Sequence, residues 1–272
     1  MTKSEEKSGM SSFDKDIAVT PKGDSLFAGN VSDNWSIAGI PNGGYLMALL
    51  TNAMLQESKN ENILVVTATY LSRLKPGPVD LAVENFASSL SLDRYQTRLI
   101  QDGKEHIRAM GTFRPSNMDR TYDRCEKSAP ELAPLEQCLA APSVPTYTLL
   151  DNVDMRLDPE CAGWVTGKLS EKSEMKGWIK FKDDRPFDAL SILLMADAFP
   201  PPVLASLGSV AWVPTVELST SLYQVPATKW LKCQFRTYFM SRGFLQEDGE
   251  VWDEDGNLVA ACRQAARFKK AK

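Results

Sequence analysis

Residues 43–56 read Gly-Gly-Tyr-Leu-Met-Ala-Leu-Leu-Thr-Asn-Ala-Met-Leu-Gln, a stretch that is apolar nearly all round. A helix at the surface of a protein keeps one polar face toward water, whereas this stretch has no continuous polar face. The sequence therefore predicts a helix at residues 43–56 that the rest of the fold surrounds on most sides.

Strand-like runs follow this helix, and turn signals separate them at residues 75–78 (Lys-Pro-Gly-Pro) and at Asp102-Gly103. The runs are expected at residues 63–74, 79–90, 92–100 and 106–113. Short connections between long strands favour an antiparallel meander.

The same pattern returns after residue 150, with a helix expected at residues 187–207 that the prolines at 200–202 break late. Strands are expected at residues 153–157, 177–181, 212–223, 230–240, 243–252 and 258–268. Val-Val-Thr67 matches Val-Pro-Thr215 at an offset of 215 minus 67, or 148, and Asp102-Gly103 matches Asp255-Gly256 at an offset of 153. A period this long indicates a duplicated domain and not a solenoid repeat.

An apolar helix followed by a curved antiparallel meander is the hotdog arrangement, in which the sheet wraps the helix. The predicted fold class is α+β, a tandem or double hotdog with two long antiparallel curved sheets that each wrap a central helix. Two such units can pair edge to edge and continue one sheet, which hides the edge strands. The expected domains are a flexible N-terminus (1–23), an N-terminal hotdog (24–114), a linker (115–150) and a C-terminal hotdog (151–272).

Composition excludes several classes of partner and location. The net charge is −4 and the basic residues form no long cluster, so a nucleic-acid partner is not expected. The most apolar region, residues 189–213, is interrupted by Asp197 and three prolines, so no membrane span is expected. The N-terminus has no apolar signal core, and the five cysteines contain no C-x-x-C pair, which favours reduced thiols in the cytoplasm.

Asp197 is unusual because it lies seven residues after Leu190, on the helical stripe that also carries Leu193 and Leu194. Residues at this spacing share one helix face, and an unpaired buried carboxylate costs roughly several kcal/mol. One interpretation is a functional acid. The other is an Asp that lies just off the stripe and reaches a backbone donor or solvent.

The quoted motifs resemble those of the double-hotdog acyl-CoA thioesterases of the thioesterase II type. The resemblance covers residues 35–268 and includes Trp35-x5-Pro41-Asn42-Gly43-Gly44, Leu74-Lys75-Pro76-Gly77, and the strand starts at 153–157 and 177–180. The linker and the prolines at 200–202 depart from the family pattern, which bears on substrate range more than on the fold.

The resemblance implies a water-activating trio of Asp197 in the second helix, Thr215 at the start of the next strand and Gln264 in the last strand. It also places Gly43 and Gly44 at the start of the first helix, where backbone N–H groups could bind substrate or an oxyanion. The alternative is that the two glycines only allow a tight helix entry and close packing. Thr67 is the repeat equivalent of Thr215, but the helix expected at residues 43–56 contains no Asp or Glu that could act with it.

Other catalytic groups are poorly represented. The single histidine, His106, lies in a first-half strand, and the sequence has no G-x-S-x-G motif. A Ser-His-Asp catalytic triad or a Cys-His dyad is therefore not predicted. One histidine and scattered cysteines predict no metal site, and the absence of a Gly-rich nucleotide motif predicts no bound cofactor.

The sequence thus favours a thioester hydrolase of lipid metabolism that cleaves fatty or related acyl-CoA to free acid and CoA, and the family resemblance adds a homo-oligomer. Two alternatives remain open: a non-hydrolytic acyl-thioester binding protein, and a hotdog enzyme of a biosynthetic pathway that acts on a carrier-bound acyl group.

Overall fold

The computed structural model describes residues 10–116, 124–208 and 213–268. Residues 1–9 of the expected flexible N-terminus, 117–123 of the expected linker, residue 212 of an expected strand and the last four residues of the chain lie outside the described residues.

Most strands of the described chain join one antiparallel sheet in the order β1-β2-β6-β7-β8-β5-β12-β15-β14-β13-β11-β10-β9, and β3 and β4 form a separate pair. The strands are β1 (Thr20–Gly23), β2 (Leu26–Val31), β3 (Ser36–Ile37), β4 (Ile40–Pro41), β5 (Asn62–Tyr70), β6 (Gly77–Ser88), β7 (Asp93–Gln101), β8 (Lys104–Arg114), β9 (Leu139–Ala140), β10 (Val153–Leu157), β11 (Glu174–Phe181), β12 (Thr215–Leu222), β13 (Leu231–Ser241), β14 (Phe244–Trp252) and β15 (Leu258–Arg267). The two sheets expected from the sequence are therefore continuous with each other.

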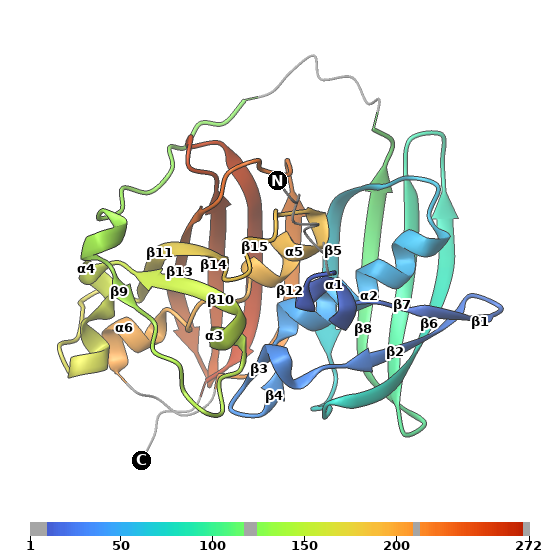
Figure 1. Ribbon diagram of the computed structural model, residues 1–272, viewed down its shortest axis with the longest axis horizontal. Helices are drawn as coiled ribbons and strands as arrows, with labels where there is room; N and C mark the ends of the chain where they lie inside the picture. Colours follow the sequence, from blue (N-terminus) through green and yellow to red (C-terminus); the bar gives the residue numbers. More distant parts are fainter. Residues whose placement is uncertain (1–9, 117–123, 209–212, 269–272) are drawn as a thin grey trace, which may run out of the picture.

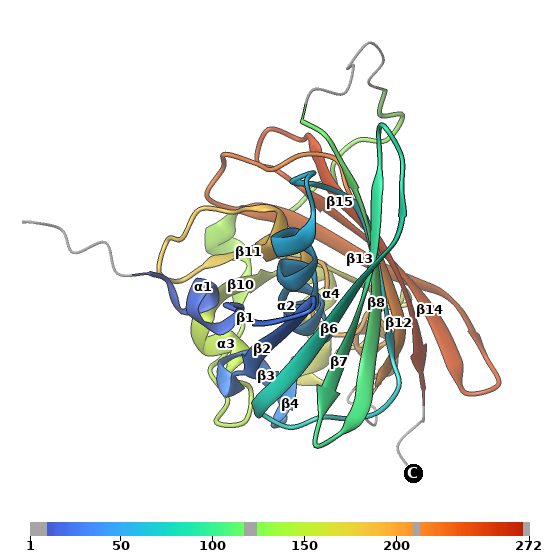
Figure 2. The same ribbon diagram turned by 90° about the vertical axis from the view of Figure 1, so that its right-hand side faces the viewer.

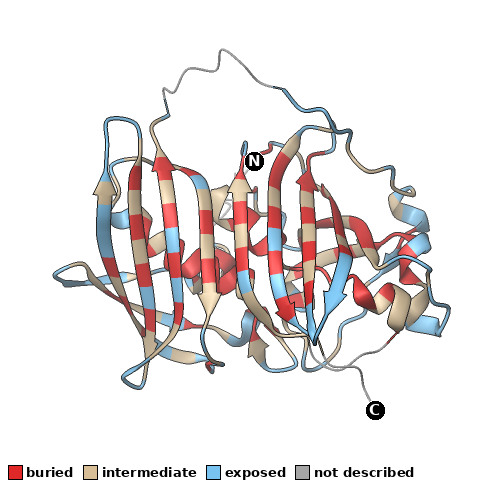
Figure 3. Ribbon diagram, turned by 180° about the vertical axis from the view of Figure 1, so that it is seen from behind, coloured by how far each residue is buried: buried red, intermediate tan, exposed pale blue. Residues whose placement is uncertain are grey.

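The helices of the described residues all lie on one face of this sheet (Figures 1, 2 and 3). They are α1 (Ser12–Asp16), α2 (Gly43–Glu57), α3 (Leu149–Asn152), α4 (Pro159–Ala162), α5 (Ala189–Met195), α6 (Val203–Leu207) and the 3-10 turns η1 (Asp33–Trp35), η2 (Leu135–Gln137) and η3 (Gly163–Thr166). No helix of the described residues combines the length and apolar character that crossing a membrane requires.

Helix α2 occupies the position that its apolar sequence predicts. Residues from Gly44 to Leu50 along it are buried, and Asn42 caps its first turn by accepting a hydrogen bond from the backbone N–H of Tyr45. The helix packs against β7 and also against α5 of the second half. The helices α2 and α5 therefore touch each other, which brings the start of α2 to the end of α5.

Helix α5 is shorter than the sequence predicted. It begins at a capping box formed by Asp188 and Ser191 and ends at Met195, so the expected helix at 187–207 is wrong in its length. Asp197 lies beyond the helix, in a turn that precedes the prolines at 200–202, whose rings cannot continue an α-helix. The carboxylate is thus placed by tertiary contacts and not by a shared stripe with Leu190.

The two halves meet where β5 pairs with β12. Thr69 lies opposite Glu217 in this ladder, and 217 minus 69 is 148, the same offset that relates Thr67 to Thr215 in the sequence. Repeat-equivalent residues can lie opposite each other only if the halves are related by an approximate two-fold axis at that pair. The sequence repeat and the strand register therefore agree.

The N-terminal segment contributes structure that the sequence did not predict. Phe13 of α1 is fully buried, with its ring 5.4 Å from that of Trp35 in an edge arrangement. Asp14 of the same helix forms an ion pair with Arg185, which precedes α5. The described part of the segment that we expected to be flexible is therefore attached to both halves.

The second part of the expected linker is also engaged. Strand β9 pairs with β10 at the edge of the sheet, and the backbone N–H of Ala133 donates to Asp158. The carbonyl of Ala133 in turn accepts from the indole of Trp178. This region lies along the edge of the second half.

Candidate active site

Asp197, Thr215 and Gln264 converge in the structure. The Nε2 atom of Gln264 donates to Oδ1 of Asp197 at 3.1 Å and also contacts Oγ1 of Thr215. Gln264 comes from β15, Thr215 begins β12, and the two strands are neighbours in the sheet. The amide therefore joins the acid to the hydroxyl across three separate elements.

The second oxygen of Asp197 is held by the first half of the chain. Oδ2 accepts from the backbone N–H of Gly44 at 2.9 Å and from Nδ2 of Asn42 at 3.0 Å. The same Asn42 amide donates to the backbone carbonyl of Asp197 at 2.8 Å. The start of α2 thus fixes both the backbone and the side chain of the acid, and its dipole favours a negative charge there.

The glycine pair allows this close approach. A Cβ atom on Gly44 would lie 2.4 Å from the backbone oxygen of Leu193, and one on Gly43 would lie 2.9 Å from Oδ2 of Asp197. Side chains at these positions would push α2 away from α5. The packing interpretation of the pair is therefore supported by contacts, and the N–H of Gly44 is already committed to Asp197.

Burial of Asp197 raises the pKa of its carboxyl to about 6, because the charged form is removed from water. Hydrogen bonds from the backbone of Gly44 and Gly43 and from the side chains of Asn42 and Gln264 lower the pKa and offset part of this rise. The carboxyl consequently exchanges its proton close to neutrality, which suits a general base.

Tyr70, at the end of β5, completes the wall of the site. Its hydroxyl donates to the carbonyl of Gly43 at 2.7 Å, and burial raises the pKa of the phenol well above its usual value, with a further rise from the nearby Asp197. The tyrosine is neutral at physiological pH and holds the first residue of α2 in place.

Sequence reasoning missed Asn42 and Tyr70 as members of the site. Asn42 carried a usable signal, since Asn directly before a predicted helix is a preferred N-cap residue. Tyr70 carried no such signal, because a tyrosine near the end of a strand is ordinary. The contacts of both residues with the glycine pair and Asp197 depend on how the two halves dock.

His106 forms a hydrogen bond of 3.0 Å between its Nδ1 atom and the hydroxyl of Ser72. No carboxylate of the described residues hydrogen-bonds to the other ring nitrogen, so an orienting acid is missing from this pair. The neighbouring Glu105 is instead bound to Arg108.

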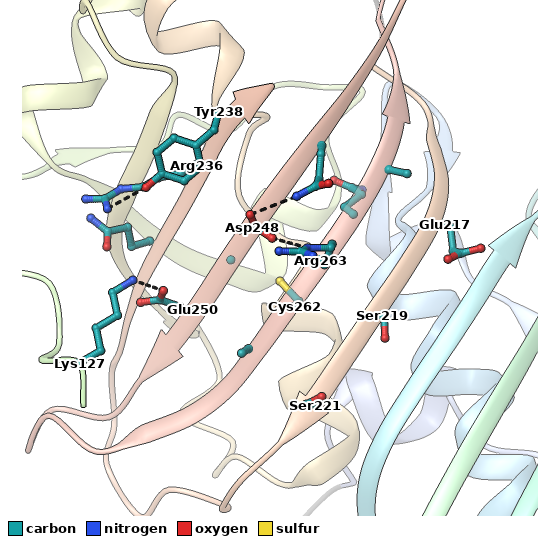
Figure 4. A pocket seen from close by; sticks show the side chains of 16 residues that line it. Lys127, Glu217, Ser219, Ser221, Arg236, Tyr238, Asp248, Glu250, Cys262 and Arg263 are labelled. Carbon is teal, nitrogen blue, oxygen red and sulfur yellow. Dashed lines mark hydrogen bonds and ion pairs between the residues drawn. The ribbon is translucent and has the colours of Figure 1, made fainter. Parts of the chain in front are cut away.

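A hollow of about 720 Å³ lies on the helix-free face of the second half (Figure 4). Its lining includes ion pairs between Arg263 and Asp248 and between Lys127 and Glu250. Asp197 and Thr215 do not line it. The hollow is a polar surface on the far side of the sheet from the helices.

Comparison with known proteins identifies the family. The model of the acyl-CoA thioesterase N-terminal domain matches residues 31–114, and that of the acyl-CoA thioesterase C-terminal domain matches residues 129–268. An uncharacterized protein of Mycobacterium tuberculosis is 24% identical over 266 residues, which cover 89% of this chain and 90% of that protein.

Solved structures show the same fold. A conserved protein with the hot dog fold from Alicyclobacillus acidocaldarius is 20% identical with a TM-score of 0.88, covering 97% of this chain and 100% of that one. An acyl-CoA thioesterase II from Mycobacterium marinum is 14% identical with a TM-score of 0.74, covering 96% and 99%. Because the C-terminal-domain match alone spans more than half of the residues, the chain belongs to the acyl-CoA thioesterase family.

Proposed function

We propose that this protein is an acyl-CoA thioesterase that hydrolyses fatty or related acyl-CoA to free acid and CoA. The observation that supports it most directly is the single amide of Gln264, which bridges the acid Asp197 and the hydroxyl of Thr215. A base, a hydroxyl and an amide held together are the groups needed to position and deprotonate one water molecule.

The two oxygens of Asp197 have different roles in this proposal. Oδ2 is occupied by Gly44 and Asn42, whereas Oδ1 accepts only from Gln264 among the described residues. Oδ1 is therefore the oxygen that takes the proton of the attacking water. The hydroxyl of Thr215 accepts from Gln264 and so keeps its own proton free to donate to that water.

The thioester carbonyl needs a donor for the oxyanion that develops on it. Of the glycine pair, the N–H of Gly44 donates to Asp197 at 2.9 Å, and that of Gly43 contributes a weaker interaction with the same carboxyl, so we propose that the N–H of Gly43 is shared with the oxyanion and that the positive end of α2 also serves it. A donor of this kind is typically worth roughly 3–4 kcal/mol of the barrier.

We further propose that the chain is a tandem double hotdog with one active site. An offset of 153 carries Gln264 onto Gly111, where a Cβ atom would lie 2.8 Å from the sulfur of Met54. Thr67, the partner of Thr215, is already paired with Ser219 at 2.8 Å. The first half therefore lacks the amide and contributes its helix start to the second-half site.

Purified protein assayed with a panel of acyl-CoA and acyl-carrier thioesters and a thiol-reactive dye tests the proposal. We expect thiol release on at least one acyl-CoA. Thermal stabilisation by acyl-CoA with no thiol release would instead indicate a non-hydrolytic binding protein, and release only from carrier thioesters would indicate a biosynthetic role.

A cytoplasmic location, a role in lipid metabolism and a homo-oligomeric state remain predictions. Cell fractionation and light scattering of the purified protein test the first and the last.

A further inference from the structure

Three polar side chains form a row across neighbouring strands of the second half. Thr237 of β13 lies opposite Glu247 of β14, and Glu247 lies opposite Gln264 of β15. Their exposed fractions are 8%, 9% and 8%. Directly opposite residues on one face of an antiparallel pair have Cβ atoms about 4.5–5.5 Å apart. The carboxyl of Glu247 is therefore within reach of the Gln264 amide.

Glu247 points to the helix side of the sheet. The adjacent Asp248 lines the hollow on the opposite face, where it pairs with Arg263 (Figure 4). Because successive side chains of a strand alternate between faces, Glu247 and Asp248 point in opposite directions. Glu247 thus shares its face with the buried Leu245 and Val251 and not with the ion pairs.

Glu247 and Gln264 each have an acceptor oxygen with no hydrogen-bond donor among the described residues. Both protons of the Gln264 amide nitrogen face Asp197 and Thr215, and no donor of the described residues reaches its Oε1 atom. No donor of these residues reaches the Glu247 carboxyl, and the hydroxyl of Thr237 is buried without a partner. Two acceptors side by side, on residues that are only 9% and 8% exposed, repel each other unless one of them carries a proton.

The charges around Glu247 favour that proton. Burial raises the pKa of Glu247 well above its usual value, and the negative charges of Asp197 and Asp248 raise it further. The thiol of Cys262 is the other titratable group close to Glu247 on this side, and α6, which packs nearby, has no titratable side chain.

The cations of the adjoining strands are engaged elsewhere. Arg263 is paired with Asp248, and Arg236 is paired with Glu174. Among the described residues, no ion pair involves Glu247, and the groups that shift its pKa include no cation.

We propose that Glu247 is a positioning residue, whose carboxyl O–H donates to Oε1 of Gln264 and so holds the amide with its nitrogen toward Asp197 and Thr215. This inference rests on the proposed thioesterase function. An amide that rotated by half a turn would present its oxygen to the Asp197 carboxylate, and the water-binding arrangement would be lost.

Two substitutions separate this role from simple packing. Glu247→Gln keeps a donor of nearly the same shape, so we expect kcat on acyl-CoA within about threefold of wild type. Glu247→Leu keeps the bulk but removes the donor, and we expect kcat to fall about tenfold or more with KM little changed. A melting temperature of Glu247→Leu equal to or above that of wild type would exclude unfolding as the cause.

The pH dependence of the hydrolysis rate provides a second test. Because the pKa of Glu247 is raised, wild-type activity is expected to fall at high pH, when Glu247 loses the proton that it donates. Glu247→Gln cannot ionise, so its activity should persist at the same pH. Three results would each overturn the inference. They are a Glu247→Gln variant that loses activity at the same high pH as wild type, a Glu247→Leu variant with full activity, and a Glu247→Gln variant as slow as Glu247→Leu.

Carbon-13 NMR of side-chain carboxyls, assigned by comparing wild type with Glu247→Gln, reads the protonation state without turnover. A protonated Glu247 at pH 7 supports the inference, and an ionised one overturns it. A wild-type protein that hydrolyses no thioester would contradict the proposed function alone, since this NMR result still decides the state of Glu247.

Discussion

The Oδ2 atom of Asp197 accepts a hydrogen bond of 2.9 Å from the backbone N–H of Gly44, a residue that lies 153 positions earlier in the chain. The acid of one half therefore caps the central helix of the other. This contact makes the docking of the halves a condition for the site, because neither half contains both partners.

Asp197→Asn should abolish hydrolysis while leaving the fold intact. Asn keeps the shape and can still accept from Gly44, but it cannot take a proton from water, so we expect kcat to fall about 10³-fold. Thiol release from acyl-CoA measures the effect, with Asp248→Asn on the opposite face as the matched control. Activity of Asp197→Asn close to that of the control would remove Asp197 from the role of base.

The stability of the same variant should depend on pH. The pKa of Asp197 is raised from 3.8 to about 6, so the folded state keeps this proton where the unfolded state has lost it. The resulting stabilisation is complete below pH 3.8 and is lost as pH rises through about 6. The melting temperature of Asp197→Asn minus that of wild type should therefore be larger at pH 7 than at pH 4, and an equal difference at both would contradict the raised pKa.

Asn42→Asp should move the acid limb of the pH–rate profile. Wild-type kcat/KM is expected to rise with pH around a midpoint near 6, as Asp197 ionises. Asp at position 42 can still cap Tyr45, but it replaces the donor to Asp197 with a second negative charge, which raises the pKa of Asp197 further. Initial rates between pH 4 and 9 measure the midpoint. A midpoint that stays in place or falls would show that Asn42 does not tune the acid.

Thr215→Val and Thr215→Ser test the hydroxyl. Valine is close in shape to threonine but has no hydroxyl, so we expect the rate to fall about tenfold. Serine keeps the hydroxyl and should stay within a few fold of wild type. Equal rates for the two variants would indicate that Thr215 only fills space at the start of β12.

Gly44→Ala should separate the two central helices. The new Cβ would lie 2.4 Å from the backbone oxygen of Leu193, a contact that only a backbone shift relieves. We expect a loss of roughly 1–3 kcal/mol of unfolding free energy together with a loss of activity. Gly29→Ala is the matched control, since its Cβ would meet side-chain atoms of Leu81 and Val79 at 3.3 Å and 3.4 Å. Equal stability losses in the two variants would argue against a special contact at Gly44.

The sequence predicted the strands well where hydrophobic patterns are strong. The strand at Val153–Leu157 has the predicted bounds, and the last strand ends within one residue of the expected position. β1 was missed because its residues, Thr-Pro-Lys-Gly, are all exposed and show no alternation. α1 was missed because five residues are too few for a helical period, and its place depends on Phe13 entering an aromatic cluster.

The candidate site was likewise predicted only in part. The identities of Asp197, Thr215 and Gln264 followed from motifs that this sequence shares with a family, and the structure brings the three side chains together. The environment of Asp197 did not follow, because the sequence predicted a helical stripe and the structure shows a turn after α5.

The sequence by itself determined the apolar helix α2, the alternating strands and the repeat, because burial and turn formation are encoded by residues close together in the chain. Only the tertiary structure decided which groups hold Asp197 and which carboxyl faces Gln264. Those contacts join residues such as Asn42 and Asp197 that are 155 positions apart, and they exist only once the two halves share one sheet.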